Sequence, residues 1–152
     1  ETGSVVGNIV MLPGGRLLVH GHDRKPSTPY DTGVWQSSST DHGRTWSPPR
    51  RVTGVDGGEP VLIRAADRLL SFIRGRKEHA IRQHLAVSDD WGETWETSLT
   101  RIEASDPAVK GLAHPFAMVN PQRTGEVIVL TTERPLPGRV WRPDRAWPTV
   151  LF

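Results

Sequence analysis

An eight-residue phrase occurs twice in this chain of 152 residues and limits how the chain can fold. Residues 39–46 read STDHGRTW and residues 88–95 read SDDWGETW, so both copies have the form Ser-x-Asp-x-Gly-x-Thr-Trp. Their aspartates, Asp41 and Asp90, stand 49 positions apart. A period of this length is typical of a propeller blade, in which four short strands and their turns form one repeated unit.

The sequence around the two copies repeats as well. GGRLLVHG at 14–21 is echoed by ADRLLSFI at 66–73 and more weakly by TGEVIVLT at 124–131, and each is a turn followed by a short apolar run. These echoes divide the chain into units of roughly 4–55, 56–108 and 109–152. The sequence therefore predicts an all-β fold of propeller blades, each of four antiparallel strands, with about three blades present.

The expected strands follow the same period. In the first unit they cover residues 5–12, 16–21, 32–38 and 46–53, and in the second 60–64, 68–73, 80–87 and 95–102. The third unit begins with strands at 115–119 and 126–132, and no copy of the phrase follows them. Its tail, ERPLPGRVWRPDRAWPTVLF, is rich in proline and arginine and is a poor match for two more regular strands.

The phrase predicts a hairpin turn that is held by its own side chains. The glycine supplies the positive φ that the turn requires, and the aspartate accepts hydrogen bonds from turn N–H groups. The serine and threonine hydroxyls close the same network, and the tryptophan starts the next strand and buries its ring between neighbouring sheets. The residues concerned are Ser39, Asp41, Gly43, Thr45 and Trp46 in the first copy and Ser88, Asp90, Gly92, Thr94 and Trp95 in the second.

The repeated phrase resembles the Asp box, or bacterial neuraminidase repeat, of sialidase-like β-propellers. The resemblance covers both full units and implies that the boxes lie on hairpins at the outer rim, away from an active site. Asp41 and Asp90 then have structural roles and are not a catalytic carboxylate pair. Propellers of this kind have six blades or more, so we expect either part of a larger protein or a ring that copies of the chain complete by self-association.

The resemblance also implies a set of site residues. Sialidases hold the substrate carboxylate with three arginines and use a tyrosine nucleophile activated by a glutamate, with an aspartate as acid and base. Glu59 opens the second unit and Arg74 ends its second strand 15 positions later, similar to the segment that carries the activating glutamate and one clamp arginine. Asp31 lies in a loop comparable to that of the acid/base aspartate, with Asp23 and Arg24 as weaker candidates there.

Ordinary structural roles are the alternative for each candidate. Glu59 is then a solvated residue at a strand start, Arg74 a loop charge and Asp31 a turn aspartate.

The chain departs from the sialidase pattern in several places. Val5-Val6-Gly7 stands where the first clamp arginine is expected, and the single tyrosine, Tyr30, is in the wrong unit for the nucleophile. The third unit starts with His114-Pro115, so His114 becomes a candidate for lining a substrate pocket. No motif selects a further clamp residue among Arg134, Arg139 and Arg142. A complete sialidase site is therefore not expected from this chain alone.

Three functions follow in order of preference. The first is a sialidase-like glycoside hydrolase, or a fragment of one, that acts without a cofactor on an anionic, sialic-acid-like sugar. The second is a non-catalytic propeller module that binds a carbohydrate or a protein. The third is a propeller-fold polysaccharide lyase in which a histidine such as His114 acts as the base.

Composition and charge exclude other classes. Cysteine is absent, and His20-x-His22 places two rings on one strand face without a third ligand at metal-binding spacing, so we expect no metal site. The net charge is only +2, and the richest basic stretch, residues 74–77, is followed at once by Glu78, so nucleic acid is not an expected partner. No apolar run approaches the about 20 residues of a membrane span. No signal peptide is visible, and only the family resemblance favours an extracytoplasmic location.

Overall fold

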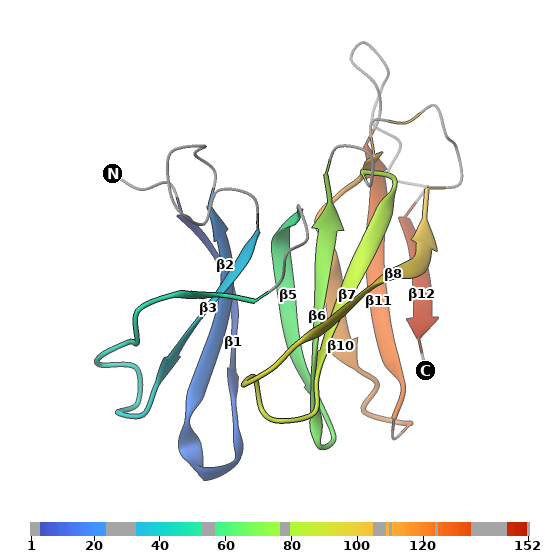
Figure 1. Cartoon of the computed structure of the whole chain (residues 1–152). Helices are drawn as coiled ribbons and strands as arrows, with labels where there is room; N and C mark the ends of the chain where they lie inside the picture. Colours follow the sequence, from blue (N-terminus) through green and yellow to red (C-terminus); the bar gives the residue numbers. More distant parts are fainter. Residues whose placement is uncertain are drawn as a thin grey trace.

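In this computed structural model the described residues are 4–23, 33–52, 57–76, 80–104, 109, 111–123, 125–134 and 146–151, with side chains left out at 4–6, 23, 134 and 146–151. They form three antiparallel sheets that stand side by side and succeed one another along the chain (Figure 1). The predicted all-β fold of consecutive propeller blades is confirmed. Among the described residues no helix is long and apolar enough to cross a membrane.

The sheets are here named blades 1, 2 and 3. Blade 1 contains β1 (Ser4–Met11), β2 (Leu17–Asp23), β3 (Val34–Ser39) and β4 (Arg50–Arg51), with the 3-10 turn η1 (Pro13–Gly15) between the first two. Blade 2 contains β5 (Gly57–Ala65), β6 (Arg68–Gly75), β7 (Arg82–Ser88) and β8 (Glu96–Glu103), in that order. Blade 3 contains β10 (Phe116–Val119), β11 (Val127–Arg134) and β12 (Ala146–Leu151), and the short β9 (Gly111–Leu112) also pairs with β11.

Two strand predictions were inaccurate. The fourth strand of blade 1 was expected over 46–53 but is reduced to Arg50–Arg51, because Pro48 and Pro49 have no N–H to donate to β3. Ser47 and Val52 on either side of the prolines do donate to that strand. In the tail, Ala146–Leu151 forms a regular strand paired with β11, although the composition argued poorly for strands there.

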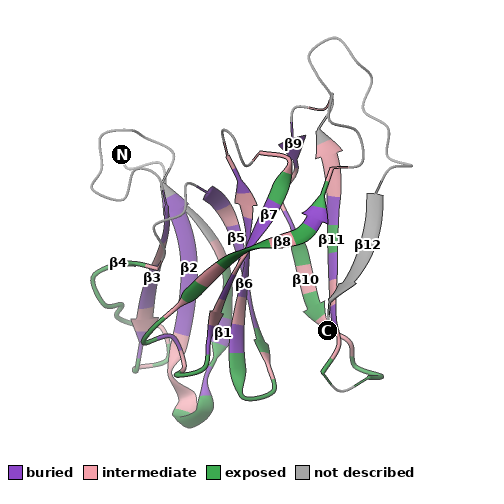
Figure 2. Cartoon of the chain, turned by 45° about the vertical axis from the view of Figure 1, so that its right-hand side comes forward, coloured by how far each residue is buried: buried purple, intermediate pink, exposed green. Residues whose placement is uncertain are grey.

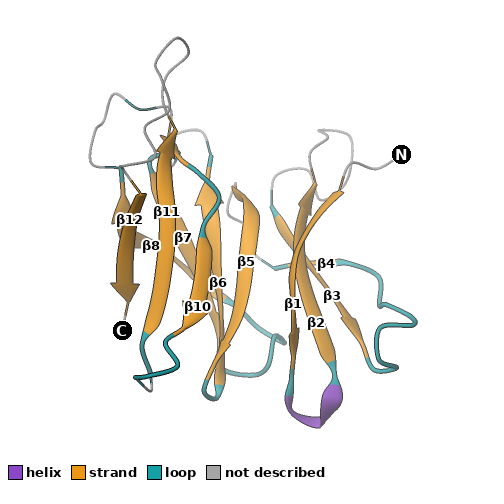
Figure 3. Cartoon of the chain, turned by 180° about the vertical axis from the view of Figure 1, so that it is seen from behind, coloured by secondary structure: helices purple, strands orange, loops and turns teal. Residues whose placement is uncertain are grey.

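The register separates two ends of the blades. Gly58, near the start of β5, pairs with Arg74, near the end of β6, and this end is the upper one in Figure 1. Ser88, at the end of β7, pairs with Leu69 at the start of β6, so the second copy of the repeated phrase follows at the lower end. The inner strands β1, β5 and β10 lie next to one another (Figure 3), and β5 contacts the other two. A site at the start of β5 is therefore close to all three blades.

The interface between blades 2 and 3 is an apolar core. Phe72 is fully buried at its centre, and Val61 and Ile63 of β5 pack with Val127 and Val129 of β11. Burial of a side chain of this size stabilises a fold by about 1.5–3 kcal/mol. Hydrophobic burial therefore fixes β10 and β11 against the strand that carries Glu59.

The interface between blades 1 and 2 mixes apolar and polar groups. Leu18, Leu62 and Leu69 are fully buried in it, and Trp95 packs against them. His20 and Ser71 are fully buried polar side chains in the same interface, and His20 Nδ1 lies 3.0 Å from Ser71 Oγ. This interface therefore depends on specific polar pairing as well as on burial.

The outward faces of blades 1 and 3 are apolar but exposed. Ile9 and Met11 of β1 are 53% and 66% exposed, and Phe116 and Met118 of β10 are 64% and 52% exposed (Figure 2). Because alternate residues of a strand point to opposite faces, these side chains lie on the faces turned away from blade 2.

Candidate functional site

The repeated phrase forms the same turn in blades 1 and 2. In the first copy Ser39 Oγ donates to Asp41 Oδ1 at 2.7 Å, and Thr45 donates to Asp41 through both its N–H and its hydroxyl. His42 and Gly43 both have positive φ, at 61° and 84°, as the two central residues of a type I′ turn do. The turn thus requires left-handed backbone at a histidine as well as at the glycine.

The second copy repeats this geometry closely. Ser88 Oγ donates to Asp90 Oδ1 at 2.7 Å, Thr94 donates to Asp90 through its N–H and its hydroxyl, and Gly92 N–H donates to Ser88 Oγ. Hydrogen bonds from the threonine hydroxyl and N–H, then from the serine, lower the pKa of Asp90 and bring the pKa of Asp41 from 3.8 to about 2. Both aspartates are engaged in holding the turns at the lower end.

Replacing both turn aspartates with asparagine should reduce the acid sensitivity of the fold. A carboxyl group whose pKa is lower in the folded state stabilises that state above its unfolded pKa of about 3.8, and the contribution is lost as the pH falls toward 2. The urea midpoint of the natural chain should therefore fall between pH 4 and pH 2 more steeply than that of the variant carrying Asp41→Asn and Asp90→Asn. Equal slopes for the two proteins would show that these carboxylates do not carry the effect.

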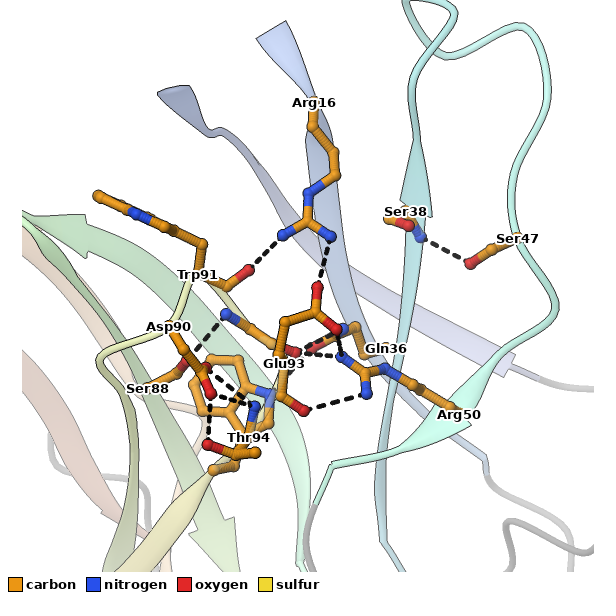
Figure 4. A network of polar contacts seen from close by, with 12 residues as sticks. Arg16, Gln36, Ser38, Ser47, Arg50, Ser88, Asp90, Trp91, Glu93 and Thr94 are labelled. Carbon is orange, nitrogen blue, oxygen red and sulfur yellow. Dashed lines mark hydrogen bonds and ion pairs between the residues drawn. The ribbon is translucent and has the colours of Figure 1, made fainter. Parts of the chain in front are cut away.

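The second turn docks onto blade 1 through a set of polar contacts (Figure 4). Gln36 Nε2 donates to the Gly92 carbonyl at 3.0 Å, and Trp95 Nε1 donates to Gln36 Oε1 at 2.9 Å. Arg50 donates to the Gly92 and Glu93 carbonyls. Arg16, directly before β2, donates to Glu93 Oε1 and to the Trp91 carbonyl of the same segment. These contacts hold blade 2 on blade 1 at the lower end.

The two turn glycines should respond differently to alanine. Gly92 has φ +91°, and a Cβ added there would lie 2.9 Å from Leu18 Cδ2, whereas at Gly43, with φ +84°, the nearest atom would be 3.6 Å away. Left-handed backbone costs either alanine about 1 kcal/mol, and overpacking against Leu18 adds about 1 kcal/mol or more at Gly92 alone. Urea unfolding should show Gly92→Ala as the less stable variant. A similar loss in both would mean that the turn shifts to make room.

A second group of polar residues gathers at the upper end. Arg74 Nε lies 2.8 Å from Glu59 Oε2, in an ion pair that lacks the alignment of a hydrogen bond. The side chains are 13% and 24% exposed, respectively. The family resemblance pointed to these two residues from their order and spacing, and the register of β5 and β6 brings them together. They form a partly accessible charged pair at the start of the inner strand.

The backbone at Glu59 is in an uncommon conformation. Its φ is +49°, where the pairing of β5 with β6 shifts register between Gly58 and Val61. Its N–H donates at 2.9 Å to Nδ1 of His22, a buried side chain of β2 in blade 1. A bulge turns a side chain away from the regular direction of its strand, and left-handed backbone at a non-glycine residue is often kept at functional sites.

His114 joins the same group from blade 3. Its pKa is lowered by partial burial, while the Glu59 carboxylate and a hydrogen bond to the Glu59 main chain oppose the shift and Arg74 adds to it. The imidazole is therefore neutral at neutral pH and able to accept a proton. The lyase alternative, with His114 as its base, remains a prediction.

Sequence reasoning missed two members of this group. It tested His22 as a zinc ligand and favoured a solvated or hydrogen-bonded histidine without a place in the site, and no motif pointed to Arg76. A Cβ added at Gly58 would lie 2.3 Å from Arg76 Nη2, so the guanidinium of Arg76 covers the glycine next to Glu59. The signal in the sequence was slight, because Arg76 is one of the basic residues of the stretch 74–77 and lies just beyond the end of β6.

The histidine pair of β2 is used in packing and hydrogen bonding. Burial lowers the pKa of His20 to about 3, so its fully buried ring is neutral, and it lies edge-on to Trp95 with centroids 4.7 Å apart. His22 accepts the bond from Glu59, as described above. Within the described part of the chain, no cluster of three or more acidic or histidine side chains is placed to hold a metal ion.

Several predicted site residues lie in parts of the chain that the structure does not describe. Asp31, Tyr30, Arg24, Arg139 and Arg142 lie outside the described residues, as do the side chains of Asp23 and Arg134. The upper-end group is therefore defined here as Glu59, Arg74, Arg76, His114 and His22.

Comparison with solved structures agrees with the architecture. A microbial sialidase, Hadza microbial sialidase Hz136, aligns over 97% of this chain at 17% identity with a TM-score of 0.63. A protein of unknown function from Dyadobacter fermentans aligns over 82% at 19% identity with a TM-score of 0.60. This chain spans 34% and 42% of those two proteins. At such identities the likeness shows a sialidase-like fold only.

No protein-family model matches the sequence, and no curated protein matches it.

Proposed function

We propose that this chain carries part of the sugar site of a sialidase-like glycoside hydrolase acting on an anionic sugar. The observation that carries the proposal is the convergence of Glu59 and Arg74 of blade 2 with His114 of blade 3 at the upper end. Both turn aspartates lie at the other end and are satisfied within their turns.

Each member of the group has a chemical role in this proposal. Arg74 binds the sugar carboxylate, because a guanidinium presents a planar fork of donors that matches a carboxylate. Glu59 is the carboxylate that activates a tyrosine nucleophile, which a single copy of the chain does not supply because Tyr30 is in the wrong unit. Neutral His114 hydrogen-bonds a sugar hydroxyl. Arg74 and Arg76 together outnumber the single carboxylate of Glu59, so the local charge favours an anionic ligand.

The proposal is tested by release of a fluorophore from a sialoside. Because a single copy of the chain lacks a complete site, the assay uses its self-associated form, isolated by size-exclusion chromatography. This form should release the fluorophore, and Glu59→Gln should reduce the rate by at least about 100-fold, the contribution expected of an acid–base group. Glu103→Gln is the matched control, since Glu103 forms an exposed ion pair with Arg82 on the edge of blade 2. A self-associated form without activity, or a Glu59→Gln variant as active as the control, would contradict the hydrolase proposal.

The Glu59–Arg74 ion pair also favours a second candidate, a non-catalytic module that binds an acidic glycan. In the described residues the carboxylate that would serve a tyrosine contacts an arginine instead. A glutamate in that position holds the arginine in place for a carboxylate ligand. Saturable binding of sialic acid without turnover, weakened by Arg74→Ala and retained in Glu59→Gln, would support this candidate over the hydrolase.

A further inference from the structure

The two repeated turns differ in the hydrogen-bond partners of the tryptophan indole N–H and of the glycine carbonyl. In the second turn the amide of Gln36 lies between them, because Trp95 Nε1 donates to Gln36 Oε1 at 2.9 Å and Gln36 Nε2 donates to the Gly92 carbonyl at 3.0 Å. In the first turn no amide lies between them, and Trp46 Nε1 donates directly to the Gly43 carbonyl at 3.1 Å. The first turn therefore has the same two groups, closed on each other.

The surface around Trp46 has the composition of a blade interface. Asn8 bonds to Leu62 and therefore lies on the face of β1 that is turned toward blade 2. Ile9 and Met11 lie on the opposite face of this strand, away from blade 2. Met11 pairs with Leu17, whose Cδ1 would lie 3.6 Å from a Cβ at Gly43, next to the Trp46 ring. Ile9, Met11 and Trp46 are all exposed on this face, at 53%, 66% and 37%.

We propose that this face of blade 1, formed by Ile9, Met11, Gly43 and Trp46, docks a further propeller blade that presents a primary amide. The amide enters between Trp46 Nε1 and the Gly43 carbonyl, as that of Gln36 does in the second turn. The docked blade supplies one carbonyl acceptor and one N–H donor, so neither group of the turn is left unpaired when water is excluded. Its apolar side chains cover Ile9 and Met11.

The chain's own third blade does not have this chemistry. In blade 1 the second turn is received by His20 and Gln36, which contact Trp95 and are register partners on β2 and β3. The alignment of 124–131 with 14–21 puts Leu130 at the position of His20, and the register partner of Leu130 is Pro148. Leucine and proline side chains have no hydrogen-bonding group. A second copy placed head to tail would therefore offer Trp46 no amide at these two positions.

Blade 2 has apolar residues at the two positions that correspond to His20 and Gln36, and it faces a blade without the turn. Its residues at these two positions are Phe72 and Leu85, which are register partners and pack against blade 3. The sequence of blade 3 has no copy of the phrase. A blade that packs against a copy of the turn thus has polar residues at these two positions, and a blade that packs against a blade without the turn has apolar ones. The blade that packs against Trp46 should therefore have polar residues there.

The test gives the chain itself a receiving blade. Leu130→His with Pro148→Gln copies His20 and Gln36 onto blade 3, and sedimentation velocity over a range of concentrations measures self-association. The double variant should associate at least about tenfold more tightly than the natural chain, as expected for two new buried hydrogen bonds. Adding Trp46→Phe should remove that gain. A folded double variant without a gain, or a gain that survives Trp46→Phe, would overturn the proposal.

The natural chain provides an independent measurement. Trp46→Phe alone should leave its self-association unchanged, because blade 3 has leucine and proline at the two positions that correspond to His20 and Gln36. Weaker association of Trp46→Phe would show that a second copy covers this face as it stands, and would also overturn the proposal. Circular dichroism checks folding, and Leu130→Asn with Pro148 retained is a second way to place an amide on the same face.

Discussion

Trp95→Ala should lower the free energy of unfolding by about 3–4 kcal/mol, the range of a large aromatic removed from a core. Trp95 packs against two buried apolar clusters, one with Leu18, Leu62 and Leu69 and one with Ile73, and its ring lies edge-on to His20. Truncation leaves a cavity between blades 1 and 2 and removes the partner of Gln36 Oε1, a buried acceptor. Both losses act on the same interface, so the effect is large for one substitution.

Trp46→Ala is the matched control for this prediction. Trp46 occupies the same position of the same turn, but it is 37% exposed, and in the described part of the chain its indole N–H bonds to Gly43 of its own turn. Its loss should cost less than about 1 kcal/mol. Urea unfolding followed by circular dichroism compares the two variants directly. Equal losses would mean that the two tryptophans stabilise their turns alone and that Trp95 does not join the blades.

Much of the fold follows from the repeated phrase, but the roles of its two tryptophans do not. Both copies predict a ring buried between sheets, and for Trp46 this is wrong in the described structure because no sheet lies on that side of blade 1. A local pattern specifies the turn and the direction of the ring. Burial depends on which blade stands next to it, and that is a property of the whole assembly.

The upper-end group shows the same division. The family resemblance was sufficient to select Glu59 and Arg74 as site residues, and the hairpin of β5 and β6 brings them together, since it sets the start of one strand beside the end of the next. His22 and His114 are distant in sequence, and only the packing of β2 and β10 around β5 places them there. The positive φ of Glu59 had no signal, because glutamate does not ordinarily adopt it.

Arg74→Ala should weaken the binding of free sialic acid by about 100-fold, as expected when one partner of a partly buried, charge-assisted contact is removed. Arg74→Lys should lose about tenfold, because an ammonium keeps the charge but not the planar fork of donors. Calorimetric titration measures both affinities. Arg82→Ala is the control for loss of an arginine from an ion pair, since Arg82 contacts Glu103 at 2.7 Å on an exposed edge of blade 2.

The methyl ester of sialic acid separates a carboxylate contact from a general loss of the site. If Arg74 binds the carboxylate, the natural chain should bind the ester about 100-fold more weakly than the acid, and Arg74→Ala should bind the two equally. A variant that has only lost structure would weaken acid and ester by the same factor and keep their ratio. That outcome, in a variant with an unchanged circular dichroism spectrum, would assign Arg74 to the support of Glu59 and of the bulge in β5, and would place the carboxylate elsewhere.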